Sequence, residues 1–144
     1  MRELHEHIVI GSKDSSIRAA EKKLKSILDG LHLASSEEHN LLVAASEAVN
    51  NAVVHGNKKD PAKKVLLDIN CSDQDVVLEV QDEGRGFNPK NLPNPLLPEN
   101  LLKPSGRGIH IMKSLMDRVN FDFTSGGTTV IMELKVGKNK SQKG

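Results

Sequence analysis

The chain has 144 residues, of which 37% are hydrophobic and 27% charged, which suits one soluble domain with its own core. A net charge of +1 and the lack of Tyr and Trp argue against a surface for nucleic acid or anionic membranes, since these need basic patches or stacking rings. A lone cysteine, Cys71, excludes an internal disulfide, and no apolar run is long enough to span a membrane, so a cytoplasmic protein is expected.

A strand and two helices are predicted before Gly56. The strand covers 4–10, with Leu4, Ile8 and Ile10 on one side. The first helix is capped by Asp14 or Ser15, and its apolar side consists of Ile17, Ala20, Leu24, Ile27, Leu28 and Leu31. A capping box of Ser35 with Glu38 begins the second helix, which ends near Gly56.

The second half is predicted to contain two hairpins and a helix. In chain order we expect strands over 65–69 and 76–80, a helix over 108–116, and strands over 119–123 and 130–136. Five of the six prolines lie in 88–105, which predicts a long loop because proline lacks a backbone donor. The lysine-rich stretch 137–144 is predicted to be a disordered tail, which leaves a single domain over 1–136.

This order of elements predicts the fold class. Helices with one apolar side, together with hairpins, favour a two-layer α/β sandwich with a mixed, mostly antiparallel sheet and helices on one face.

The second helix carries a line of polar side chains. Helical spacing places Glu47, Asn51 and His55 one turn apart, away from the apolar side. A carboxamide oxygen such as that of Asn51 suits Mg²⁺, and a carboxylate such as that of Glu47 can orient or deprotonate a hydroxyl group. His55 is expected to play a supporting or structural role. Taken alone, these residues are equally typical of a solvated helix face.

Two glycine motifs complete a possible nucleotide site. Asp82 ends a strand and can accept a hydrogen bond from an exocyclic amine such as that of adenine, while Gly84 and Gly86 let the backbone approach a flat base. Gly106-Arg107-Gly108 begins a helix, whose free N–H groups suit phosphate, and Arg107 or Lys103 can add charge. Each motif alone is also typical of a turn or helix start without a ligand.

Other site types are not supported. The chain has neither a Gly-x₄-Gly-Lys-[Ser/Thr] loop nor a Gly-x-Gly-x-x-Gly fingerprint after a strand. No Cys/His cluster indicates zinc. His5 and His7 can share one strand face, but two histidines near a terminus are expected to be solvated.

Together and in this order, the motifs resemble the boxes of the GHKL ATP-binding superfamily. The segment 46–55 is similar to the N-box of bacterial anti-sigma-factor serine/threonine kinases, and Asp82-x-Gly84-x-Gly86 and Gly106-x-Gly108 resemble the two glycine boxes. The strand start 127–130 resembles the box whose threonine, here Thr128, helps to hold the adenine side.

This resemblance implies a Bergerat-type ATP-binding fold, with ATP and Mg²⁺ as cofactors. It implies that Asn51 holds Mg²⁺, Glu47 activates the hydroxyl group and Asp82 selects adenine, with 88–105 as the ATP lid. The implied substrate is a small anti-anti-sigma (STAS-type) protein, and such kinases also sequester a sigma factor, usually as homodimers. The alternative is an ATP-binding regulatory module that traps a partner without phosphoryl transfer.

Overall fold

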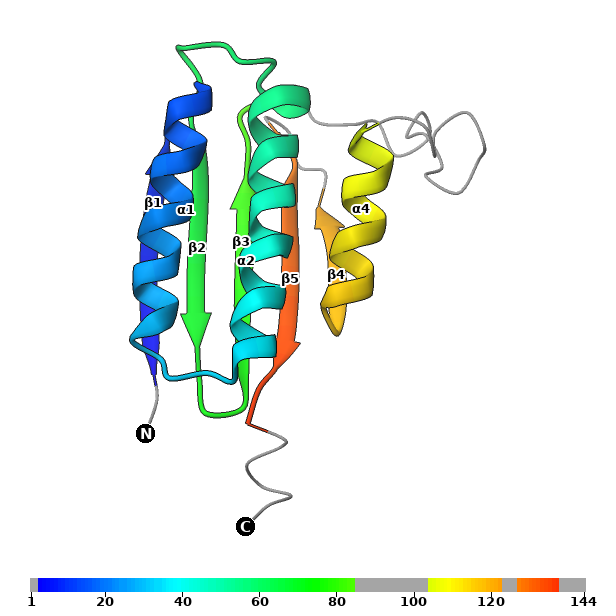
Figure 1. Ribbon diagram of the computed structural model, residues 1–144. Helices are drawn as coiled ribbons and strands as arrows, with labels where there is room; N and C mark the ends of the chain where they lie inside the picture. The colour runs from blue at the N-terminus through cyan, green and yellow to red at the C-terminus, as the bar shows by residue number, and fades with distance from the viewer. Residues whose placement is uncertain (1–2, 85–103, 123–126, 138–144) are drawn as a thin grey trace.

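The computed structural model describes residues 3–84, 104–122 and 127–137 (Figure 1). Its elements, in chain order, are β1 (Leu4–Ile10), α1 (Asp14–Asp29), α2 (Ser35–Asn50), a π-helical segment η1 (Asn51–Gly56), β2 (Val65–Cys71), β3 (Asp75–Gln81), α4 (Pro104–Leu115), β4 (Arg118–Asp122) and β5 (Thr129–Lys135). None of these helices is long and apolar enough to cross a membrane.

The strands form one five-stranded sheet in the order β1-β2-β3-β5-β4. All four neighbouring pairs are antiparallel, so the sheet expected to be mostly antiparallel has no parallel pair among the described strands. Figure 1 shows the helices on one face of this sheet. The predicted two-layer α/β sandwich is therefore confirmed.

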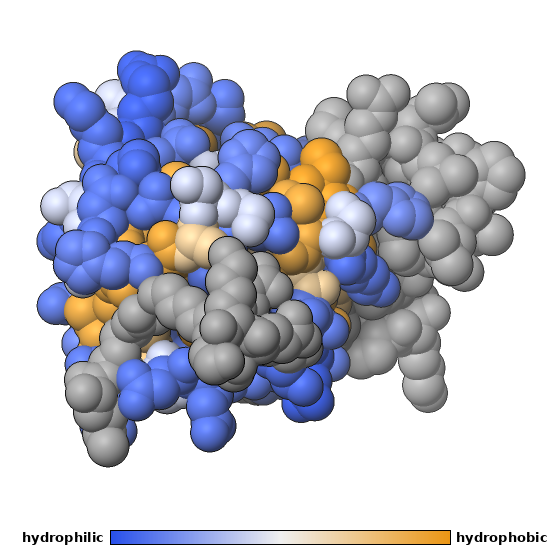
Figure 2. All heavy atoms as spheres, turned by 60° about the horizontal axis from the view of Figure 1, so that its bottom comes forward, coloured by the Kyte–Doolittle hydropathy of each residue, from blue (hydrophilic) through white to orange (hydrophobic). Residues whose placement is uncertain are grey.

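The core fills the space between the sheet and the helices. Alternate strand residues point into it, which is why burial along β2 and β3 alternates. Its largest fully buried side chains are aliphatic: Ile10, Leu24, Leu28, Leu41, Leu67, Ile69, Leu78, Met112, Met132, Val53, Val65 and Val76. Cys71 is 5% exposed and packs in this core. Hydrophilic residues cover most of the described surface at the lower end of the molecule (Figure 2).

The N-caps of α1 and α2 differ from the predicted caps. Lys13 is the N-cap of α1, and Asp14 is already in the first turn. Ala34 is the N-cap of α2, and its N–H donates to Glu37 Oε1 at 3.0 Å. The predicted pairing of Ser35 with Glu38 is wrong, because Ser35 is already helical and Glu38 instead binds Lys25 Nζ of α1 at 2.8 Å.

The third helix also begins earlier than expected. It starts at Pro104, inside the predicted 88–105 loop, and includes the glycine pair that was predicted to open it. Proline fits a first helical turn because the N–H that it lacks would have no partner there. The rest of that loop, and the predicted tail apart from Gly137, lie outside the described residues.

Candidate functional site

Three elements bring their ends together at the upper end of the molecule in Figure 1. The C-terminal end of α2, the end of β3 and the start of α4 all lie there. In an antiparallel arrangement of this kind, residues far apart in the sequence can line one cleft.

Glu47 and Asn51 lie against α4. A methyl group at Gly108 would be 3.0 Å from Asn51 Nδ2, 3.4 Å from Asn51 Oδ1 and 3.1 Å from Glu47 Oε2. Both polar side chains are half-buried, whereas Gly108 is buried. The predicted carboxylate and carboxamide therefore converge on one small space, which the absence of a side chain at Gly108 keeps open.

Helix α2 continues into the wider π-helical segment η1, which begins at Asn51. In η1 the N–H of Asn57 donates to the carbonyl oxygen of Ala52 at 2.7 Å, a five-residue step that replaces the usual four. Such π turns are frequent at functional sites. His55 lies within η1 and is exposed. It therefore does not join Glu47 and Asn51 as a third half-buried polar residue.

Asp82 is a buried carboxylate held by backbone groups. It is 6% exposed, and its Oδ1 accepts hydrogen bonds from the N–H of Gly84 at 2.9 Å and of Thr128 at 3.1 Å. Burial raises the pKa of Asp82, although these two bonds act in the opposite direction. The other oxygen, Oδ2, receives no hydrogen bond from the described residues, so it can accept one from a ligand.

Three glycines let the backbone close around this carboxylate. A methyl group at Gly56 would overlap the Asp82 carboxylate, and one at Gly127 would overlap the Asp82 carbonyl oxygen. A methyl group at Gly84 would overlap the carbonyl oxygen of Gly56. The end of η1, the turn after β3 and the start of β5 are thus in direct backbone contact, which only glycine permits.

The buried side chain of Asn57 holds this turn through hydrogen bonds. The sequence did not predict this role of Asn57. The side chain is 1% exposed; its Oδ1 accepts from the N–H of Glu83 at 2.8 Å, and its Nδ2 donates to the carbonyl oxygen of Lys64 at 3.0 Å. Nδ2 also lies 3.4 Å from Ser12 Oγ, which donates to the carbonyl oxygen of Lys63 at 2.7 Å. The only local signal was a polar residue after a helix-ending glycine, as in many turns.

The predicted site residues thus form two described groups linked by η1. Glu47, Asn51 and Gly108 make one group, and Asp82, Gly84 and Thr128 make the other. Three other predicted site residues are described only in part or not at all. Gly86 lies outside the described residues, and only the backbone of Gly106 and Arg107, within α4, is described.

The donor atoms of the first group fit a hard cation. The carboxamide oxygen of Asn51 and the carboxylate of Glu47 offer oxygen ligands, which Mg²⁺ prefers, and the space beside Gly108 would be filled by a Cβ. The first turn of α4 adds backbone N–H groups without helical partners, which suit phosphate.

Comparison with known proteins identifies the family of the chain. Residues 10–134 match the family model described as the histidine kinase-like ATPase domain. The anti-sigma F factor of Geobacillus thermodenitrificans (strain NG80-2) is 31% identical over 140 residues, covering 94% of each chain. That of Anoxybacillus flavithermus (strain DSM 21510 / WK1) is 37% identical over 101 residues, covering 67% of this chain and 68% of the relative.

A solved structure shares the fold. The crystal structure of the RsbU and RsbW domains of Rv1364c from Mycobacterium tuberculosis has a TM-score of 0.69 at 21% identity. The match covers 92% of this chain and 32% of that one. The chain therefore belongs to the histidine kinase-like ATPase domain family, and the anti-sigma F factors are among its relatives.

Proposed function

We propose that this chain is an ATP-dependent protein serine/threonine kinase that also acts as an anti-sigma-type regulator. The observation that carries the proposal is the convergence of Glu47 and Asn51 on the space left by Gly108, next to the start of α4. A domain that only bound nucleotide would not need a carboxylate at the place where an acceptor hydroxyl group must approach the phosphates.

The adenine would lie at Asp82. Its Oδ2, which receives no hydrogen bond from the described residues, can accept one from the exocyclic amine of adenine, while the missing side chain of Gly84 makes room for the carbonyl oxygen of Gly56. Thr128, whose N–H holds the other carboxylate oxygen, would keep Asp82 in place. Because a guanine presents an oxygen acceptor instead of the amine, the same carboxylate would reject GTP.

The phosphates would lie between the start of α4 and Asn51. The first-turn N–H groups of α4 would bind phosphate oxygens, and Asn51 would hold Mg²⁺. When bound, Mg²⁺ neutralises phosphate charge as it develops during transfer.

Glu47 would activate the acceptor. It would take the proton of a serine or threonine hydroxyl group as that oxygen bonds to the γ-phosphorus and the bond to the β-phosphate bridging oxygen breaks, leaving ADP. This role depends mainly on position, which the contact with Gly108 supplies.

The partners follow from the relatives. The name anti-sigma F factor supports a sigma factor as a binding partner, and the family resemblance supports a small STAS-type protein as the phosphorylated substrate. We further propose a cytoplasmic homodimer with one ATP-binding domain over 1–136.

The test is incubation with Mg-ATP and candidate STAS-type proteins, followed by mass spectrometry for phosphoserine or phosphothreonine. Glu47→Gln should abolish transfer and keep ATP binding, whereas the exposed control Glu6→Gln should change neither. Unchanged transfer by Glu47→Gln would refute the assigned base. ATP binding without phosphorylation of any candidate would favour a regulatory module that sequesters its partner without transfer.

A further inference from the structure

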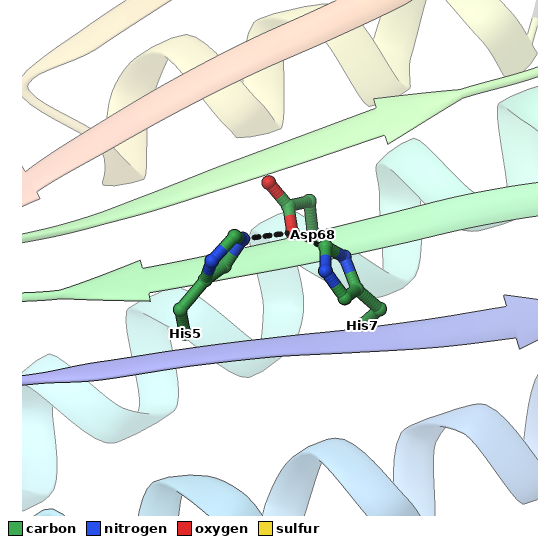
Figure 3. A group of neighbouring side chains, drawn as sticks. All are labelled: His5, His7 and Asp68. Atoms are coloured by element: carbon green, nitrogen blue, oxygen red, sulfur yellow. Dashed lines mark hydrogen bonds and ion pairs between the residues drawn. The ribbon is translucent and has the colours of Figure 1, made fainter.

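A group of metal-ligating side chains lies on the sheet face that the helices leave uncovered. Ile8 and Ile10 of β1 and Leu67 and Ile69 of β2 point into the core. Side chains alternate along a strand, so the residues between them point to the other face. Figure 3 shows His5 and His7 from β1 and Asp68 from β2 turned toward one another.

The three side chains converge on a single oxygen atom. His5 Nε2 lies 2.8 Å and His7 Nδ1 2.7 Å from Asp68 Oδ1. One ligand atom from each residue lies within 4.8 Å of the other two. The histidines are 54% and 58% exposed, so a cation and its waters can reach them, while Asp68 is 18% exposed and better fixed.

We propose that His5, His7 and Asp68 bind a divalent transition-metal cation of the Zn²⁺ type, separate from the nucleotide site. Two imidazole nitrogens and one carboxylate oxygen form a borderline ligand set, which favours Zn²⁺ over Mg²⁺ or Ca²⁺. Zn–ligand bonds of about 2.0–2.1 Å in a tetrahedron place ligand atoms about 3.3 Å apart. The two observed distances would widen by about half an ångström, with each ring proton on the nitrogen that faces away.

The strand register makes this arrangement rigid. His7 and Asp68 are direct cross-strand partners, and β1 and β2 pair over their whole lengths. Asn70, opposite His5, donates from Nδ2 to Asp68 Oδ2 at 3.3 Å, so Oδ1 is left to face the histidines. A hydrogen-bonded ligand carboxylate of this kind is typical of metal sites.

The charge on the neighbouring strand also favours a cation. Glu79 of β3 is the direct cross-strand partner of Asp68 and shares its face. Two like charges directly opposite each other destabilise a sheet. A divalent cation at Asp68 would offset this repulsion and would clamp the edge strand β1 to β2.

The test is calorimetric titration of the tag-free full chain with Zn²⁺, repeated with His7→Gln, Asp68→Asn and the exposed control His39→Gln. We expect one cation per chain, tetrahedral visible bands with Co²⁺ as the probe, and unchanged binding by the control. Loss of a residue that only hydrogen-bonds to a metal ligand weakens metal affinity by roughly 10- to 100-fold, so loss of a ligand itself should weaken Zn²⁺ binding by at least that much. Zn²⁺ should slow hydrogen exchange of the β1 amides in the native chain and leave it unchanged in the ligand variants.

Circular dichroism confirms that each variant is folded. The proposal would be overturned if the native chain bound no Zn²⁺ or if Asp68→Asn bound Zn²⁺ as tightly as the native chain. It would also be overturned if His39→Gln weakened Zn²⁺ binding as much as the ligand variants do. Because Mg-ATP titration is measured in the same samples, loss of the metal site alone is distinguished from failure of the nucleotide site.

Discussion

Replacing Asn57 by alanine should destabilise the protein far more than an ordinary surface change. The buried carboxamide joins three segments: it accepts from the N–H of Glu83 at 2.8 Å and donates to the carbonyl oxygen of Lys64 at 3.0 Å and toward Ser12 Oγ at 3.4 Å. Alanine removes one hydrogen-bond partner from each of two backbone groups, the N–H of Glu83 and the carbonyl oxygen of Lys64. The turn that carries Asp82 would lose its support from η1.

The cost can be estimated from these contacts. Each buried polar group left without a partner costs about 1–3 kcal/mol, so two such groups cost roughly 2–6 kcal/mol. The long contact to Ser12 Oγ adds little, because it is near the limit of a hydrogen bond. With about 2–4 °C per kcal/mol for a chain of this size, Tm should fall by roughly 4–24 °C.

The assay is urea and thermal unfolding followed by circular dichroism. Asn57→Asp keeps an acceptor for Glu83 but turns a buried carboxylate oxygen toward the carbonyl oxygen of Lys64, so it should not restore the stability that Asn57→Ala loses. Asn50→Ala is the matched control, because Asn50 is exposed at the end of α2. If Asn57→Ala stayed within about 0.5 kcal/mol of that control, the carboxamide would not hold the turn.

Gly84→Ala should lower Tm strongly, because its Cβ would overlap the carbonyl oxygen of Gly56. In the control Gly30→Ala the Cβ meets nothing closer than 3.4 Å, so thermal unfolding should show little change. Equal Tm shifts in the two variants would contradict this reasoning. Gly108→Ala should fold, but its Cβ would displace Asn51 and Glu47, so calorimetry should show Mg-ATP binding weakened by roughly 10- to 100-fold. Unchanged affinity would argue against a nucleotide site beside Gly108. Asp82→Asn should flatten the pH dependence of the unfolding free energy. Burial raises the pKa of Asp82 in the folded protein above 3.8, the value in the unfolded chain. Between these two pKa values the folded state holds a proton that the unfolded chain has lost. The unfolding free energy of the native protein should therefore fall as pH rises through this window. Urea unfolding at several pH values checks this, and parallel native and variant curves would count against it.

The sheet was predictable because its signal is local. Alternation placed every strand to within about two residues, and hairpin spacing predicted the antiparallel β2–β3 and β4–β5 pairs. The β1–β2 and β3–β5 pairs join strands that are far apart in the sequence, so they were not predictable in this way. Helix starts were less predictable, because neighbouring Ser and Glu residues compete for the same cap. At α2 the cap contact is made by Glu37, whereas Glu38 binds Lys25 of another helix.

The candidate site was predictable where one helical turn or one tight turn carries it. Glu47 and Asn51 lie one turn apart, and Asp82 is held by the N–H of Gly84 two residues later. Its other supports were not predictable, because they exist only once distant segments meet. Asn57 reaches Ser12 and Glu83, and nothing in the residues around Asn57 indicates either partner.

The histidine pair shows the same limit. The spacing of His5 and His7 was visible, and the pair was interpreted as solvated because both residues lie near a terminus. Asp68 joins them only through the register of β1 with β2. A cross-strand site of this kind requires the sheet to be known.

The most direct measurement is calorimetry of the purified chain with ATP, ADP and GTP in the presence of Mg²⁺, on the native protein and on Asp82→Asn. A nucleotide site between α2, the Asp82 turn and α4 predicts saturating heat with ATP and ADP, little with GTP, and loss of the adenine signal in the variant. No heat at millimolar ATP, or the same heat from Asp82→Asn, would contradict it.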